Sequence, residues 1–236
     1  MNSSESTPVV RLTGVTKTYV KGEVKVTPLE NANISVQAGD FVALMGPSGS
    51  GKSTLLNLIA GIDRATSGRV EVAGRDITLA SENDLAVWRR RTLGYVFQQF
   101  NLMPVLTAAE NVELPLLNLP LDRERRRRQV ATVLELVGLA DRADHYPRQL
   151  SGGQEQRVAI ARVLAADPQL ILADEPTGSL DRESARGVMD LLVQLNERFQ
   201  KTLIIVTHDP EVAGRARRRL RLDKGQFTDE PTPGPS

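Results

Sequence analysis

A glycine-rich stretch near residue 50 has the spacing of a loop that binds phosphate groups. It reads Gly46-Pro47-Ser48-Gly49-Ser50-Gly51-Lys52-Ser53 and fits the pattern G-x-x-x-x-G-K-[ST]. Glycines let a backbone bend until its N–H groups converge on phosphate oxygens, and a helix that begins there adds positive potential. In such a loop Lys52 reaches the β- and γ-phosphates, Ser53 offers its hydroxyl to Mg²⁺, and the adjoining Thr54 belongs to the same site. We call residues 46–53 the phosphate loop.

An apolar run much later in the chain ends in two adjacent carboxylates. It reads Leu170-Ile171-Leu172-Ala173-Asp174-Glu175. Beside a phosphate loop, this pair is suited to nucleotide hydrolysis. Asp174 would hold Mg²⁺ through water, and Glu175 would act as the general base for the attacking water. The alternative is a pair that only caps the next helix, which is common for acidic residues after a strand.

A second glycine pair begins another helical pattern. The segment reads Leu150-Ser151-Gly152-Gly153-Gln154, and helical spacing follows at residues 156–166. Its hydroxyl, its exposed backbone N–H groups and the helix N-terminus form another phosphate cradle. We call residues 151–154 the second cradle. Because Lys52 already provides the γ-phosphate site of its own chain, the second cradle makes sense if it serves ATP held by another subunit.

These motifs need strands that bring them together. Short apolar runs alternate with longer amphipathic runs, a pattern that predicts a largely parallel sheet covered by helices. The clearest strands are predicted at residues 41–45, 95–97, 170–173 and 202–207. Ligands bind at the carboxyl ends of the strands in such sheets, and each of these strands is followed by a polar or glycine-rich turn. The predicted class is therefore α/β, with a phosphate-loop core.

Two additions to the core are predicted. The segment from about 101 to 149 has no comparable strand and indicates an inserted helical subdomain, with a helix at residues 122–137. A small antiparallel sheet is predicted at residues 9–13, 25–28, 33–36 and 68–72. Residues 9–227 are expected to form the whole domain, and residues 1–8 and 228–236 are expected to be disordered.

Composition excludes several classes of protein. The chain has 236 residues, 30 Lys and Arg against 29 Asp and Glu, and no cysteine, so it has neither disulfides nor thiolate metal sites. No apolar run approaches the roughly 18 residues of a membrane-spanning helix. Arginine runs at 89–91, at 123 with 125–128, and at 217–219 are expected to be solvated helix faces or contacts near a lipid surface. Aromatic residues make up only 4%, too few for nucleic acid to be an expected partner.

The segment Leu150-Ser151-Gly152-Gly153-Gln154 matches without a change the LSGGQ signature of the ATP-binding cassette (ABC) family of transport ATPases. With the phosphate loop and the Asp174-Glu175 pair, the resemblance covers residues 9–227. It implies an ABC ATPase fold that binds ATP and Mg²⁺. It also implies that two copies form a head-to-tail sandwich, in which ATP lies between the phosphate loop of one copy and the second cradle of the other.

The resemblance assigns roles to four more residues. Gln98 resembles the glutamine of the family's Q-loop, which touches Mg²⁺ and the attacking water. Asp181 lies in Ser179-Leu180-Asp181, which resembles the D-loop that crosses the dimer interface. His208 resembles the switch histidine that hydrogen-bonds the γ-phosphate, and Tyr19 resembles the aromatic residue that stacks on adenine. A histidine satisfied by backbone and a tyrosine that only packs are the plainer alternatives.

Three further segments resemble a subgroup of lipoprotein-releasing, macrolide-exporting and FtsE-like cassettes. They span residues 97–102, 110–115 and 172–178. The likeness implies a subunit on the cytoplasmic face of the cell membrane, docked on a separate membrane permease, with a periplasmic adaptor as a further possible partner. Export or transport directed to the envelope is the expected function. The alternatives are an FtsE-like ATPase that regulates a membrane partner without transport, and an ABC ATPase that acts on nucleic acid.

Overall fold

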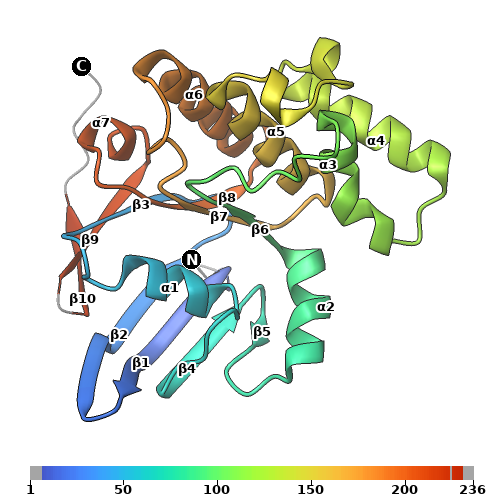
Figure 1. Cartoon of the computed structure of the whole chain (residues 1–236). Coiled ribbons are helices and arrows are strands. Elements are labelled where there is room, and N and C mark those ends of the chain that lie inside the picture. The colour runs from blue at the N-terminus through green and yellow to red at the C-terminus, as the bar shows by residue number, and fades with distance from the viewer. Residues whose placement is uncertain (1–6, 224, 231–236) are drawn as a thin grey trace, which may run out of the picture.

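Ten strands form two sheets in the computed structural model, which describes residues 7–223 and 225–230 (Figure 1). The larger sheet has the order β10-β9-β3-β8-β7-β6. Its strands from β9 to β6 run parallel, and β10 joins the edge antiparallel. Their bounds are β3 Phe41–Met45, β6 Leu93–Val96, β7 Leu170–Asp174, β8 Thr202–Val206, β9 Arg218–Asp223 and β10 Gln226–Glu230. The four predicted parallel strands are confirmed, although β6 begins two residues before the predicted residues 95–97 and ends one residue before their end.

The smaller sheet is antiparallel, as predicted, and has the order β2-β1-β4-β5. Its strands are β1 Val10–Lys21, β2 Val24–Val36, β4 Ser67–Val72 and β5 Arg75–Asp76. The separate strands predicted at 25–28 and 33–36 are two parts of β2, which pairs with β1 in one long hairpin. Three register shifts along this pairing interrupt the alternation of apolar and polar residues, which explains why the sequence indicated two short strands.

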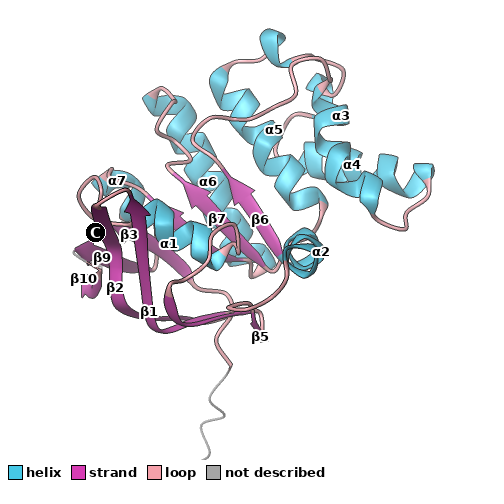
Figure 2. Cartoon of the chain, turned by 60° about the horizontal axis from the view of Figure 1, so that its bottom comes forward, coloured by secondary structure: helices cyan, strands magenta, loops and turns pink. Residues whose placement is uncertain are grey.

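Helix α1, Lys52–Ile59, lies between the two sheets (Figures 1 and 2). Its buried leucines and Ile59 share one apolar cluster with residues of both sheets. The other face of the larger sheet carries α5, Gly152–Ala165, and α6, Arg182–Phe199, which belong to a second cluster. The larger sheet is therefore covered on both faces, which is why β3, β7 and β8 are almost wholly apolar.

The helices between β6 and α5 gather at one end of the molecule (Figure 1). They are α3 Ala108–Glu113, α4 Arg123–Leu136 and the short 3₁₀ turns Leu114–Asn118, Ala140–Arg142 and Pro147–Gln149. Both α3 and α4 pack on α5. The sequence predicted no helix at α2, Glu82–Thr92, at α6 or at α7, Pro210–Ala213. Within residues 7–223 and 225–230, no helix is both long enough and apolar enough to cross a membrane.

Helix α5 begins four residues before the predicted start at residue 156. Two glycines are poor helix formers, so the sequence favoured a later start. A capping box offsets this preference, because Ser151 Oγ accepts from Gln154 N–H at 3.3 Å and Gln154 Oε1 accepts from Ser151 N–H at 2.9 Å. The second cradle is therefore the first turn of α5.

The chain end also differs from expectation. Residues 228–230, expected to be disordered, belong to β10, whose Asp229 binds Arg218 and whose Glu230 binds Arg221. These ion pairs fix charged residues that composition alone assigned to a tail. The arginine run 217–219 accordingly enters strand β9 and not a helix face. Residues 1–6 and 231–236, also expected to be disordered, lie outside the described residues.

Candidate nucleotide site

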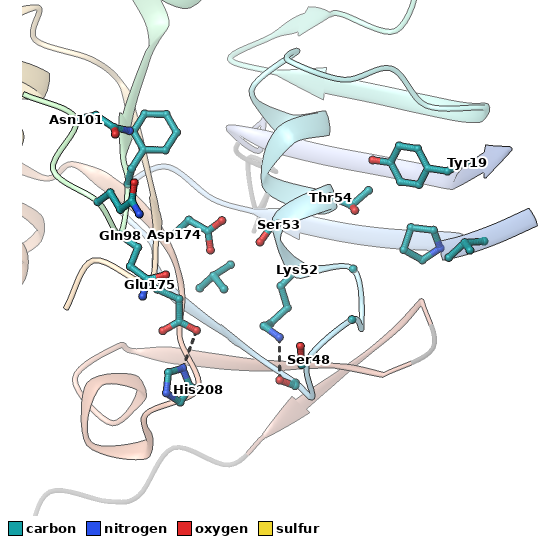
Figure 3. Close-up of a pocket in the computed structure, with 18 residues that line it drawn as sticks. Tyr19, Ser48, Lys52, Ser53, Thr54, Gln98, Asn101, Asp174, Glu175 and His208 are labelled. Carbon is teal, nitrogen blue, oxygen red and sulfur yellow. Dashed lines mark hydrogen bonds and ion pairs between the residues drawn. The ribbon is translucent and has the colours of Figure 1, made fainter. Parts of the chain in front are cut away.

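A cavity of about 720 Å³ lies where the predicted motifs meet, at the carboxyl ends of the parallel strands (Figure 3). Most of the residues predicted to bind nucleotide or metal line it. They are Tyr19, Gly46, Ser48, Gly49, Gly51, Lys52, Ser53, Thr54, Gln98, Asp174, Glu175 and His208. Pro47 and Ser50 belong to the phosphate loop but do not line the cavity. The second cradle and Asp181 lie outside it.

The phosphate loop requires glycine at two of its positions. Gly46 and Gly51 have φ values of 150° and 100°. A Cβ on Gly46 would lie 2.3 Å from the carbonyl oxygen of Leu222, and one on Gly51 would lie 2.6 Å from that of Pro28. No side chain can be added at either position without moving backbone. Only glycine fits at these two positions, where the loop runs between neighbouring backbone and the cavity.

Helix α1 begins at this loop without a cap. Its N-cap is Gly51, and no side chain hydrogen-bonds its first turn. The six other α-helices in the part of the chain that the structure describes each have a side-chain cap. The first N–H groups of α1 are thus available to an anion in the cavity.

The ammonium group of Lys52 lies back on the phosphate loop. Its Nζ donates to the carbonyl oxygens of Gly46 at 2.9 Å and Pro47 at 2.8 Å. These bonds hold a positive charge at the mouth of the loop (Figure 3). When phosphate binds, its oxygens would replace the two carbonyl oxygens as the acceptors of the Lys52 hydrogen bonds.

Asp174 and Glu175 end strand β7 in different environments. Burial raises the pKa of Asp174, and Glu175 adds to the rise, whereas a hydrogen bond from Ser53 and the charge of Lys52 oppose it. Glu175 has a φ of 49°, in the left-handed region, and its N–H donates to Val206 O at 2.9 Å. This strained backbone turns the Glu175 side chain toward His208, away from Asp174 (Figure 3).

His208 follows β8 and meets Glu175 directly. Its Nδ1 lies 2.9 Å from Glu175 Oε1. That hydrogen bond, followed by the charge of the same carboxylate, raises the pKa of His208. The histidine side chain is 76% exposed, whereas that of Glu175 is 18% exposed. The imidazole therefore covers the carboxylate from the solvent side.

Tyr19 lines the far side of the cavity, and its position is fixed by a neighbouring ion pair. Its hydroxyl donates to Asp63 Oδ2 at 2.6 Å, and Lys17 Nζ donates to Asp63 Oδ1 at 2.6 Å. The same ammonium lies 4.6 Å from the centre of the Tyr19 ring. Burial, together with the bond to Asp63, raises the pKa of Tyr19. An aromatic face held in this way can stack on a planar base.

Six lining residues were missed by sequence reasoning. They are Val26, Pro28, Phe97, Gln99, Asn101 and Val206. Phe97 and Gln99 flank Gln98, so their proximity was available as a signal. Val26 lines the cavity because it pairs with Tyr19 across the hairpin, and register in a bulged hairpin cannot be read from one sequence.

The oxygen ligands that Mg²⁺ prefers are present in the cavity. Ser53 supplies a hydroxyl, Asp174 a carboxylate and Gln98 an amide oxygen. Within the described residues, no cluster of three or more His, Cys, Asp or Glu side chains could hold a metal by itself. This small donor set fits Mg²⁺, which keeps several waters and is completed by substrate phosphates, better than it fits a metal held in an all-protein cage.

The second cradle and Asp181 are satisfied within their own chain. Ser151 and Asp181 are the N-caps of α5 and α6, and Asp181 also accepts a hydrogen bond from the Ser184 hydroxyl at 2.7 Å. Because an N-cap oxygen accepts a hydrogen bond, the hydroxyl hydrogen of Ser151 remains free to donate. The cradle can therefore meet a phosphate without losing its cap.

Comparison with known proteins places these features in a family. The family model described as ABC transporter matches residues 29–178. An uncharacterized ABC transporter ATP-binding protein of Methanocaldococcus jannaschii is 48% identical over 221 residues, covering 94% of this chain and 98% of the relative. The macrolide export ATP-binding/permease protein MacB of Escherichia coli K12 is 44% identical, and the match covers 95% of this chain but only 35% of MacB.

A solved structure repeats the same architecture. The dimeric, post-hydrolysis structure of the ATP-binding cassette MJ0796, bound to ADP and Pi, is 46% identical and superposes with a TM-score of 0.87, covering 95% of this chain and 99% of the other. Another solved structure, cbiO1 of Clostridium perfringens, has a TM-score of 0.85 at 27% identity. A phosphate loop, an acidic strand end and the LSGGQ helix N-terminus on this fold make the chain a member of the ABC transporter family, as an ATP-binding cassette with ATPase activity.

Proposed function

We propose that two copies of this chain close on two ATP molecules and drive a separate membrane permease, in export or envelope-directed transport. The observation that carries the proposal is the second cradle, which is built like a phosphate site but lies outside the cavity of its own chain. A second copy can bring the cradle to the open side of that cavity. The cassette MJ0796, which is dimeric in its solved structures, supports this arrangement.

Within one half-site, each group has a distinct task. The phosphate loop and the N-terminus of α1 hold the triphosphate, Lys52 exchanges its carbonyl acceptors for the β- and γ-phosphates, and Tyr19 takes the adenine. Ser53, Asp174 and Gln98 would hold Mg²⁺, which supplies charge neutralisation on the phosphates when bound.

Hydrolysis then depends on the Glu175 and His208 pair. Glu175 accepts a proton from the attacking water, while His208 keeps the carboxylate oriented and donates toward the γ-phosphate. Asp181 and Ser151 of one copy meet the nucleotide held by the other. Loss of the γ-phosphate removes the contact between the second cradle of one copy and the nucleotide held by the other, so the dimer opens again.

The segment 99–107 supports a membrane partner. It follows Gln98, and Met103 and Val105 are 48% and 73% exposed, more apolar surface than a solvent loop needs. Leu102 packs on the helical core, so only part of the segment is available. The likeness to the macrolide export ATP-binding/permease protein MacB supports a permease partner and export. This arrangement would hold the chain on the inner face of the cell membrane, and a periplasmic adaptor would join through the permease.

Two measurements test the proposal. Because the sequence has no cysteine, Met103→Cys introduces a single thiol, and we expect it to crosslink to a membrane protein that copurifies from detergent. Leu79→Cys, 90% exposed before α2, is the matched control and should not crosslink. Equal crosslinking of both variants would contradict the proposal that residues 99–107 dock on the membrane protein. A copurified partner that activates cell-wall enzymes but moves no cargo would favour the regulatory alternative over transport.

The sandwich is tested without the membrane. Lys52→Ala chains and Ser151→Arg chains should each be inactive alone. An equal mixture should recover hydrolysis, because one complete site forms from the phosphate loop of the second chain and the cradle of the first. Normal hydrolysis by Ser151→Arg as a monomer would contradict the sandwich.

A further inference from the structure

A buried glutamine on α5 connects the two loops that carry Gln98 and Glu175. Gln156 is 0% exposed, and its amide nitrogen donates to Phe97 O at 3.2 Å and to Pro176 O at 2.6 Å. Phe97 directly precedes Gln98, and Pro176 directly follows Glu175. One side chain therefore spans the main chain at two edges of the candidate site.

The other half of this amide is not satisfied. Gln156 Oε1 is buried and has no hydrogen-bond partner among the residues that the structure describes. Buried polar atoms are nearly always paired, so an unpaired oxygen is unfavourable for the fold. An apolar side chain of similar volume would avoid it. The two donated bonds are thus the feature that only an amide can supply here.

A second side chain of α5 holds the same loop farther along. Arg162 donates to Phe100 O at 3.1 Å and to Asn101 O at 2.6 Å. The guanidinium is largely removed from water, which lowers the pKa of Arg162. Between them, Gln156 and Arg162 fix three carbonyls of residues 97–101 to one helix. This loop therefore follows any displacement of α5.

The second cradle, at the start of α5, packs on its own chain's loops. A Cβ on Gly152 would lie 3.5 Å from the Phe100 ring and 3.5 Å from Leu180. A Cβ on Gly153 would lie 2.6 Å from Ser184 Oγ. Little space separates the second cradle from the loop after β6 and from the start of α6. A displacement of the cradle therefore displaces these two segments as well.

We propose that Gln156 is a positioning residue that makes the second cradle and the catalytic loops of the same chain move as one unit. A phosphate bound at the cradle belongs to the partner's ATP, whereas Gln98 and Glu175 face the chain's own ATP. Through Gln156, occupancy of one site sets the spacing of Gln98 and Glu175 in the other. This inference rests on the proposed sandwich. It extends that proposal by naming the side chain that couples its two sites.

Mixed pairs separate the two ends of this link. An ATP-holding copy carries Ser151→Arg, and a cradle-giving copy carries Lys52→Ala, so each pair has one complete site. Gln156→Met, similar in volume but without an amide, is then placed in either copy. In the ATP-holding copy it frees the loops of the working site. There we expect kcat to fall about 10- to 100-fold, the range for misplaced catalytic groups, with KM for ATP within about twofold.

In the cradle-giving copy the same substitution disturbs only the loops of a site that cannot bind ATP. There we expect a rate within about twofold of the parent pair. Equal losses in both placements would overturn the proposal, because a role in the fold does not depend on the copy. A loss confined to the cradle-giving copy would also overturn it, because that copy supplies the only working cradle and the role would then belong to the cradle itself. Unchanged rates in both placements would overturn it as well. An inactive parent pair would instead contradict the sandwich itself, whatever the result with Gln156.

Two further variants complete the design. Asn196→Leu removes another buried amide, 2% exposed, that donates to Gly39 O at 2.7 Å and Lys201 O at 2.9 Å, far from the nucleotide cavity. It should lower the melting temperature without any dependence on the copy that carries it. Arg162→Met, which frees only Phe100 and Asn101, should repeat the dependence of Gln156→Met with a smaller loss. If Gln156→Met does not fold, Arg162→Met alone decides, and equal losses in both placements overturn the proposal.

Discussion

The phosphate loop and the second cradle are both glycine-containing helix N-termini, but their local chemistry is opposite. At the phosphate loop, α1 begins at Gly51 without a side-chain cap, beside a lysine and two carboxylates. At the second cradle, Ser151 and Gln154 cap α5, and residues 151–154 lie outside the nucleotide cavity of their own chain. The first N–H groups of α1 are therefore open to a phosphate. The second cradle has its helix end capped by side chains of its own chain.

The largest expected effect comes from silencing the chemistry beside the phosphate loop while leaving the second cradle intact. Glu175→Gln removes the proton acceptor but keeps the shape, so hydrolysis should fall by about 10²–10⁴ with ATP affinity retained. Light scattering with ATP and Mg²⁺ should then detect a dimer, because ligand that binds the closed pair shifts mass action toward it. Glu135→Gln, exposed on α4, is the control and should leave the rate unchanged. Turnover near the parental rate would move the base to another residue.

The next prediction contrasts the two sites directly. Lys52→Ala should weaken ATP binding to the monomer by about 10- to 100-fold, the loss expected for a charged hydrogen-bond donor. Ser151→Arg should leave monomer affinity unchanged and abolish the ATP-dependent dimer. Equilibrium binding and sedimentation measure the two effects separately. If both variants lose ATP affinity as monomers, the phosphate loop and the second cradle bind the same ATP molecule. The contrast between the two sites would then be wrong.

The same contrast explains what the sequence could predict. The phosphate loop, Asp174, Glu175 and His208 lie at strand ends, and strand ends converge in a parallel sheet whatever the surrounding packing. Their meeting in one cavity was therefore predictable. The start of α5 was not, because low helix propensity at two glycines is offset by a capping box that periodicity does not reveal.

Contacts between segments that are distant in the chain could not be predicted from the sequence. Residues 228–230 of β10 were expected to be disordered, but Asp229 pairs with Arg218 once β9 is in place. Gln156 was expected only as part of a helical pattern, since its acceptors, Phe97 and Pro176, come from separate segments. Pairings between distant segments carry no local spacing signal, so a single sequence does not encode them in a readable form.

A smaller effect distinguishes the two glycines of the second cradle. Gly152→Ala places its methyl 3.5 Å from Leu180 and Phe100, an ordinary contact, so it should raise the free energy of unfolding by up to about 1 kcal/mol. Gly153→Ala places its methyl 2.6 Å from Ser184 Oγ and 2.8 Å from Ser184 Cβ, and should lower it by about 1–3 kcal/mol. Chemical denaturation measures both. Equal changes would mean that Ser184 moves aside and that packing does not select Gly153.

The smallest effect concerns the ion pair between His208 and Glu175, both of which line the cavity. The bond from His208 to Glu175 raises the pKa of His208 above its ordinary value of 6.5. A raised histidine pKa means that the folded chain binds the proton more tightly, so this contribution to stability is complete below about pH 6.5 and is lost as pH rises through the folded pKa. His208 is exposed, so the contribution is that of a surface pair, less than about 1 kcal/mol. His208→Gln should therefore lower the melting temperature slightly at pH 6 and not at pH 9. If His208→Gln lowers the melting temperature equally at both pH values, the imidazole contributes by packing. Protonation of His208 would then not stabilise its contact with Glu175.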